Sequence, residues 1–125
     1  MSRPEVIITP NGPAIFHADF SPVTATNPAK PGEVVIARVS GLGPVRAALE
    51  PGEPFPSDPL AVVNSPIDVT VNGGATQVIN AVGWPGTTDN YRLDFPIPAG
   101  TLAGDARVQI AAAWIAGPEV RIAVR

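Results

Sequence analysis

Proline and glycine interrupt this sequence so often that long helices are excluded. The 125 residues include 16 prolines and 12 glycines, spread along the whole chain. Proline lacks a backbone N–H and fixes φ near −65°, and glycine adopts the positive φ of turns because it has no Cβ. Between these interruptions lie runs of roughly four to eight residues rich in Val, Ile and Thr, which are typical of the strands of a sandwich or barrel. The pattern predicts an all-β chain.

Apolar and polar residues alternate along the predicted strands. Ile67, Val69 and Val71 fall on one face, and Asp68 and Thr70 fall on the other. Such alternation favours antiparallel sheets packed face to face. The chain has no cysteine. We therefore predict an immunoglobulin-like antiparallel β-sandwich of about seven short strands without a disulfide. The runs that indicate strands are 5–9, 14–17, 33–39, 67–71, 76–82, 91–95, 108–114 and 120–124.

Two glycine-containing stretches are predicted to turn the chain. In residues 39–45, two glycines and a proline replace the alternation of a preceding strand, so we expect a bend there. The bend lacks the third glycine and the following helix of a phosphate-binding loop. Residues 72–74 read Asn-Gly-Gly, which favours a hairpin turn because these residues accept the positive φ of primed turns. The residues predicted to form the two turns are Gly41, Gly43, Pro44, Gly73 and Gly74.

Charge and hydropathy argue against two classes of protein. The net charge is −3, Lys30 is the only lysine, and the arginines are scattered. Nucleic-acid binding relies on a basic stripe that displaces phosphate counterions, and none is visible. The longest apolar run, Ile110–Ala116, is far shorter than the roughly 20 residues of a membrane-spanning helix. We expect neither nucleic-acid binding nor membrane insertion.

Residues that could carry catalysis or hold a metal do not form a recognisable motif. His17 is the only histidine, so a Ser-His-Asp triad would require it, and no serine lies in a Gly-x-Ser-x-Gly elbow. The carboxylates offer many pairs, but the sequence does not select the fixed pair of a glycosidase. A calcium site from Asp89, Asn90 and Asp105 would require the fold to bring two loops together. We expect no enzymatic activity, no cofactor and no metal.

The two tryptophans lead to different predictions. Trp114 is in register with Val108 and Ile110, so we predict that it belongs to the core. Trp84 lies in a loop rich in glycine and proline, where we favour a capping role at the open end of the sandwich over an exposed aromatic surface that stacks on sugars or anchors a protein. The candidate contacts for a ligand or partner are Trp84, Tyr91 and Asp89.

An ordered set of short motifs resembles a known bacterial module, the Solibacter-type uncharacterised C-terminal domain, which is similar to the IPT/TIG branch of immunoglobulin-like folds. The resemblance covers about residues 12–125. It implies an extracellular or cell-surface location, attachment to other domains of a long secreted protein, and no established catalytic activity. The motifs are Gly12–Phe16, Asn27–Glu33, Gly41–Val45, Ser57–Leu60, Val69–Gly74, Tyr91–Gly100 and Gly104–Asp105. The loop Trp84–Asn90 is more polar here than in the family.

These observations predict one domain at 12–125, preceded by a lead-in or linker at 1–11. The first residues lack the apolar core of a signal peptide, which indicates either a cytoplasmic protein or a fragment of a longer chain, and the resemblance favours the fragment. The predicted function is a non-catalytic interaction or spacer module at the C-terminal end of an exported bacterial protein, whose partners are neighbouring domains of the parent chain. The alternative is a module that binds carbohydrate, or another surface polymer or protein, through loop aromatics.

Overall fold

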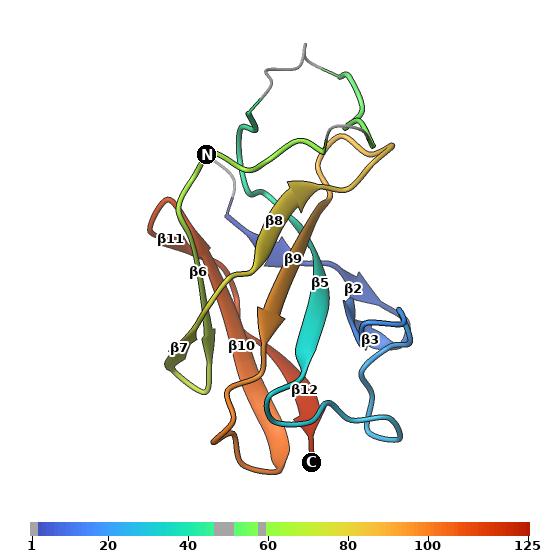
Figure 1. Ribbon diagram of the computed structural model, residues 1–125, viewed down its shortest axis with the longest axis vertical. Helices are drawn as coiled ribbons and strands as arrows, with labels where there is room; N and C mark the ends of the chain where they lie inside the picture. The colour runs from blue at the N-terminus through green and yellow to red at the C-terminus, as the bar shows by residue number, and fades with distance from the viewer. Residues whose placement is uncertain (1–2, 47–51, 58–59) are drawn as a thin grey trace.

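The computed structural model describes residues 3–46, 52–57 and 60–125, and every regular element in them is a β-strand. Figure 1 shows two sheets facing one another along the length of the molecule. The predicted all-β antiparallel sandwich without a disulfide is confirmed. The strands are β1 (Glu5–Val6), β2 (Ile8–Thr9), β3 (Gly12–Pro13), β4 (Ile15–Phe16), β5 (Val34–Ser40), β6 (Ile67–Val71), β7 (Gly74–Thr76), β8 (Asn80–Gly83), β9 (Tyr91–Pro96), β10 (Gly104–Ala112), β11 (Ile115–Ala116) and β12 (Val120–Val124).

The first sheet has the strand order β1-β5-β9-β8, and β4 also pairs with β5. Its two central strands are antiparallel, with Val39 opposite Tyr91 and Arg38 opposite Arg92. The alternation of β5 and β9 places the first pair toward the second sheet, where both residues are buried, and the second pair on the outer face. The sheet therefore has an apolar inner face and an outer face that combines charged side chains with the buried Ile36 and Val82.

The second sheet has the order β11-β10-β6-β7, with β12 also paired to β10. β10 is its longest strand and pairs antiparallel with β6, β11 and β12. Val69, Val108 and Ile122 of this sheet are buried with residues of the first sheet in one apolar core. In the part of the chain that the structure describes, no buried residue is polar or charged. Burial of apolar side chains contributes about 1.5–3 kcal/mol for each large one, so this core stabilises the sandwich.

The N-terminal segment belongs to the sandwich, in place of the lead-in or linker predicted for residues 1–11. Glu5 and Val6 pair with Ser40 and Val39 of β5, and Val6 is buried in the core. Met1 and Ser2 lie outside the described residues. The run 5–9 does form strand, but in two pieces, because β1 pairs with β5 and β2 turns away to pair with β3. The sequence pattern identified the strand without identifying its partner.

Both predicted turns are confirmed. Asn72 and Gly73 have φ of 52° and 82°, and they connect β6 to β7 in a hairpin whose second strand begins at Gly74. Gly41 and Gly43 have φ of 77° and 85° and follow β5. Positive φ at all four positions explains why asparagine and glycine occupy them. None of the described segments is a helix long and apolar enough to cross a membrane.

Candidate functional site

Several of the residues predicted from the sequence meet in one pocket of about 170 Å³, which we call the bend pocket. The glycine bend after β5, the loop before β9 and the end of β10 all contribute to it. Figure 1 shows the β8–β9 connection and the β10–β11 turn in the same half of the sandwich. The residues that line the bend pocket are Gly41, Leu42, Gly43, Pro44, Ser65, Asp89, Tyr91, Ala112 and Ala113.

Two hydrogen bonds hold the glycine bend against the loop before β9 and the start of β9. The N–H of Gly41 donates to Asp89 Oδ1 at 3.1 Å, and the Tyr91 hydroxyl donates to the Gly43 carbonyl at 2.8 Å. A Cβ at position 41 would lie 2.3 Å from the carbonyl oxygen of Arg3. The close approach and the positive φ together require glycine at position 41. The bend therefore has a fixed geometry, which the sequence indicated only as a change of direction.

Tyr91 lies mainly in the core rather than on the surface where the sequence prediction placed a ligand contact. The residue is 4% exposed, and its ring centroid is 5.1 Å from that of Phe55. Burial raises the pKa of the Tyr91 phenol, and the nearby Asp89 carboxylate raises it further. The predicted contacts Tyr91 and Asp89 both line the bend pocket. They meet in this pocket and not on an exposed loop surface.

The prediction that Trp114 belongs to the core is wrong, because this residue is 80% exposed. β10 ends at Ala112, which pairs with Ile115, so Ala113 and Trp114 form the two-residue turn between β10 and β11. Their φ values are 49° and 64°. A left-handed backbone costs a non-glycine residue roughly 1–2 kcal/mol. The alternation of 108–112 does not continue to Trp114, because the chain turns after Ala112.

Trp84 neither caps the open end of the sandwich nor stands free in a loop. Its ring lies on the outer face of the first sheet, where the Arg38 guanidinium carbon is 4.9 Å from the ring centroid. The ring of Phe20 meets it edge-on at 6.4 Å between centroids. Trp84 is half-buried by these neighbours. A guanidinium over an aromatic face contributes about 0.5–2 kcal/mol, so Trp84 has a packing role.

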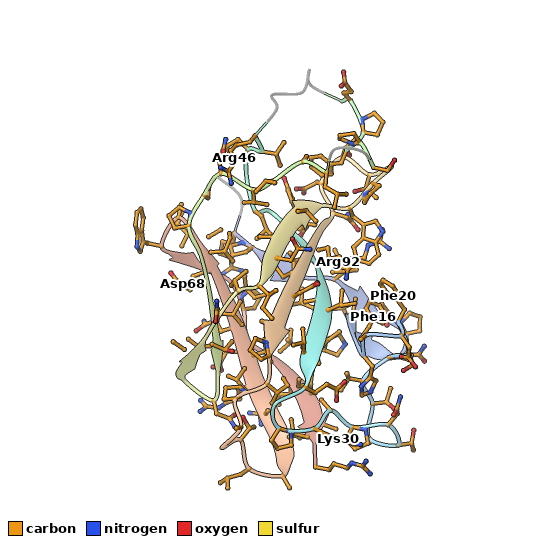
Figure 2. The ribbon with its side chains drawn as sticks, viewed as in Figure 1. Phe16, Phe20, Lys30, Arg46, Asp68 and Arg92 are labelled. Atoms are coloured by element: carbon orange, nitrogen blue, oxygen red, sulfur yellow. The ribbon has the colours of Figure 1, made fainter. Side chains whose placement is uncertain are left out.

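Trp84 is part of a group that we call the aromatic–arginine cluster, consisting of Phe16, Phe20, Arg38, Trp84 and Arg92. The ring of Phe20 lies 6.4 Å from that of Phe16 and 5.5 Å from the Arg92 guanidinium carbon. Figure 2 shows Phe16, Phe20 and Arg92 on one side of the molecule. Sequence reasoning missed this cluster, because its members come from distant segments that only sheet pairing brings together.

The arginines of the aromatic–arginine cluster have polar partners of their own. Arg38 donates from Nε to Asn90 Oδ1 at 2.5 Å, and Arg92 forms two hydrogen bonds to the carboxylate of Asp94, at 2.9 and 3.1 Å. These bonds fix each guanidinium where it covers a ring. Phe20 is the most exposed member, at 50%, and its backbone has φ of 66°.

His17 lies in a second, polar pocket of about 500 Å³, together with Asp19, Ser21, Asn27 and Glu33. Its Nδ1 contacts Glu33 Oε2, and its Nε2 lies 2.9 Å from the carbonyl oxygen of Asn27. Asp19 instead accepts hydrogen bonds from the hydroxyl and the N–H of Ser21, at 2.6 and 2.9 Å. In a catalytic triad the histidine lies between serine and aspartate. Here the histidine is bonded to neither residue through its ring.

The surroundings of His17 favour its charged form. Desolvation lowers the pKa of the imidazole, but the hydrogen bond to the Asn27 carbonyl and the hydrogen bond and charge of Glu33 outweigh it, so the pKa is raised. Both ring nitrogens face acceptors, and only the imidazolium donates from both. The pKa of Asp19 is lowered by the hydrogen bonds from Ser21. The pocket contains an ion pair that depends on pH.

The alternative calcium site from Asp89, Asn90 and Asp105 is ruled out by the topology. Asp89 and Asn90 precede β9, and Asp105 lies near the start of β10. Figure 1 shows the β8–β9 and β9–β10 connections at opposite ends of β9. A strand of this length spans about 20 Å at roughly 3.3 Å per residue, which is too far for shared ligands. Over residues 3–46, 52–57 and 60–125, no three His, Asp or Glu side chains are placed to hold a metal ion.

The sequence was compared with protein-family models, with curated proteins and with solved structures, and none of the three comparisons found a match. The resemblance to the Solibacter-type C-terminal domain therefore stays a prediction.

Proposed function

We propose that this chain is a non-catalytic interaction module, the C-terminal domain of a larger exported bacterial protein that acts at the cell surface or outside the cell. The observation that carries the proposal is the exposure of Trp114 at the tip of a hairpin, on a strained backbone. The indole contributes little to the core, so its apolar surface is available to a partner. Tryptophan is the residue type that most often anchors protein and ligand contacts.

The arrangement of hydrogen bonds around His17 supports a non-catalytic role for this residue. Both ring nitrogens of the imidazole are bonded to acceptors, and the Ser21 hydroxyl is bonded to Asp19. In a Ser-His catalytic pair, a nitrogen of the histidine must be free to accept the proton of the serine hydroxyl. The same bonds instead tie the segment from His17 to Asn27 to the start of β5, which is a structural role.

The alternative function, binding of carbohydrate or another surface polymer, is favoured by one observation. The bend pocket combines apolar and polar lining residues and includes Ala113, the neighbour of Trp114 in the turn. Pockets that bind small ligands commonly have an apolar lining with a few polar groups. Trp114 replaces Trp84 as the candidate aromatic contact for a sugar, because Trp84 is already covered by Arg38 and Phe20.

The proposal is tested by comparing which components of a cell fraction are retained by the immobilised wild-type chain and by immobilised Trp114→Ser. Both proteins are immobilised at equal density and exposed to an envelope and secreted fraction of the source cell. We expect one or more components to be retained by the wild type and lost on Trp114→Ser, while both proteins unfold at similar temperatures. Equal retention on the two proteins would contradict a role for Trp114 and remove the basis of the proposed function.

Export as part of a longer chain has its own test. Translation of the gene upstream of Met1 is expected to show a continuous reading frame with further domains and a signal peptide at its start. A stop codon directly before Met1, in frame, would contradict this part of the proposal and leave the binding function to be judged on Trp114 alone.

A further inference from the structure

We propose that the bend pocket binds one ring of a neutral saccharide, with Trp114 as a platform for the adjoining ring. This inference rests on the proposed function and names the ligand of the same site. It is argued from the size of the pocket, its lining, its charge and its rigidity.

The pocket is the size of a single ring. Its volume of about 170 Å³ is below the roughly 300–1,000 Å³ of pockets that hold drug-sized ligands. One six-membered sugar ring occupies a space of this order. A peptide recognised in extended form would instead need a free strand edge or a long groove, and the bend pocket is neither.

The lining is apolar at its base and polar at its rim, as a sugar ring requires. Leu42 and Ala112 are buried, and the ring of Tyr91 is also in the core. The carboxylate of Asp89 is exposed and uses one oxygen for the N–H of Gly41, and the Ser65 hydroxyl lies beside Gly43. A pyranose presents C–H groups on its faces and hydroxyls at its edges. The apolar base matches the faces, and Asp89 and Ser65 match the hydroxyls.

The charge of the pocket selects neutral ligands. Asp89 is the acidic residue of the lining, and no lysine, arginine or histidine is among the residues that form the pocket. A phosphate or a uronic acid would meet the Asp89 carboxylate without a compensating cation, and like charges at short range repel. A neutral hydroxyl can donate to the same carboxylate in a charge-assisted hydrogen bond.

The pocket is already arranged before a ligand arrives. The bonds from Gly41 N–H to Asp89 and from the Tyr91 hydroxyl to Gly43 hold two of its walls together. The N–H of Ala113 donates to the carbonyl of Pro66 at 2.9 Å and anchors the wall formed by the hairpin. A rigid site avoids the cost of ordering loops on binding. Trp114 follows the lining residue Ala113 directly in the chain, and its side chain is exposed.

The experiment uses Trp84→Phe as the background. The chain has two tryptophans, so this variant leaves Trp114 as the sole indole fluorophore, and Trp84 is not among the residues that line the pocket. The probes are neutral hexasaccharides of β-1,4-glucose, xylose, mannose and N-acetylglucosamine, with a galacturonic acid hexamer as the anionic comparison. Emission is followed to about 10 mM ligand, beyond the millimolar affinity expected of a small site.

We expect at least one neutral hexasaccharide to change the emission of Trp114 in a saturable way and to bind about tenfold more tightly than the anionic hexamer, a difference of about 1.4 kcal/mol. Measured by calorimetry, Trp114→Ala is expected to weaken binding about tenfold. Asp89→Asn keeps an acceptor for the N–H of Gly41 and removes the negative charge. It is therefore expected to weaken binding of the neutral hexasaccharide and to reduce the preference for it over the anionic hexamer.

The outcomes separate the ligand from the proposed function. If no neutral saccharide binds by 10 mM, or if binding is unchanged in both Trp114→Ala and Asp89→Asn, the saccharide site is overturned. If in that case a protein from the envelope fraction is still retained through Trp114, the interaction module stands with a protein partner. If the saccharide site is overturned in this way and no protein is retained through Trp114, both proposals fail.

Discussion

The two tryptophans of this chain occupy opposite environments. Trp84 is covered by Arg38 and Phe20 on the outer face of the first sheet, whereas Trp114 stands 80% exposed at the tip of the β10–β11 hairpin. The sequence pattern predicts Trp114 inside the core, which is wrong, and predicts Trp84 as a cap at the open end of the sandwich rather than on the outer face of a sheet. The difference teaches that an aromatic side chain is buried or exposed according to what crosses over it, and not according to its place in a local pattern.

The two regions also differ in whether side-chain packing offsets the cost of a left-handed backbone. Phe20 and Trp114 both have left-handed backbones, with φ of 66° and 64°. In the aromatic–arginine cluster, the rings and guanidinium groups around Phe20 offset this cost through packing. At the hairpin tip the exposed indole gains little packing in return. A cost without a packing return is a reason to look for a binding partner at Trp114 rather than at Trp84.

The largest effect is expected where the bend pocket itself is disturbed. Gly41→Ala places a Cβ 2.3 Å from the carbonyl of Arg3 on a backbone with φ of 77°. We expect a loss of about 3 kcal/mol or more in the free energy of unfolding, because strain and overlap add. Urea denaturation of the variant and the wild type measures it. Gly73→Ala is the matched control, with positive φ but open space, and it is expected to cost only about 1 kcal/mol. Equal losses would show that the close approach at the bend does not matter.

The next effect sharpens the contrast between the tryptophans. Trp84→Ala removes a half-buried ring from between Arg38 and Phe20, and we expect the free energy of unfolding to fall by about 2 kcal/mol, below the 3–5 kcal/mol of fully buried aromatics. Thermal or urea denaturation measures the loss. A variant as stable as the wild type would mean that packing of Trp84 in the aromatic–arginine cluster does not stabilise the fold. The two tryptophans would then not differ in their contribution to stability.

The opposite sign is expected at the hairpin tip. Trp114→Gly relieves the positive φ and removes almost no buried surface, so the variant should be as stable as the wild type or more stable by up to about 1 kcal/mol. The same denaturation series as for Trp84→Ala gives the result. Ala113→Gly, at the other residue of the turn, serves as a control that relieves strain while it keeps the indole. A marked loss of stability in Trp114→Gly would indicate a structural role for the indole and weaken the binding proposal.

The smallest effect concerns pH and the His17 ion pair. The pKa of His17 is raised above its ordinary value of 6.5 in the folded chain by Asn27 and Glu33, against the opposing effect of desolvation. The imidazolium therefore contributes stability that is fully present below pH 6.5 and is lost as the pH rises through the folded pKa. We expect a change of less than about 1 kcal/mol, seen as a difference between urea midpoints at pH 5 and pH 9.

The control for the pH effect removes the charge that faces His17. Glu33→Gln keeps an acceptor for the imidazole and lowers the electrostatic part of the shift, so its stability should change less between the two pH values. Asp19, which also faces His17, has a lowered pKa and titrates below this window. A wild-type chain whose stability rises from pH 5 to pH 9 would contradict the assignment, since it would place the folded pKa of His17 below 6.5.

Local pattern predicted the fold class, most of the longer strands and two of the turns, but not every element. Alternation decides which side chains share a face, and glycine and proline mark the hairpin at 72–74 and the bend at 39–45. The run predicted over 76–82 is interrupted between β7 and β8, and β3 and β11 have no counterpart among the predicted runs. For the candidate site, the sequence singled out Asp89, Tyr91 and the glycine bend, and the structure brings them together in a pocket that the sequence did not predict. No spacing rule relates Gly41 to Asp89, because their contact depends on how two sheets are paired and packed.

What the sequence determined by itself is the class of the fold, the two turns at 39–45 and 72–74, and the absence of disulfides. The tertiary structure decided that Val6 belongs to the core, that Phe20 and Arg38 cover Trp84, and that β10 ends two residues before Trp114. The physical reason is the separation along the chain of the residues that decide each property. Backbone conformation responds to adjacent residues, whereas burial is decided by segments far apart in the chain that compete to cover the same apolar surface.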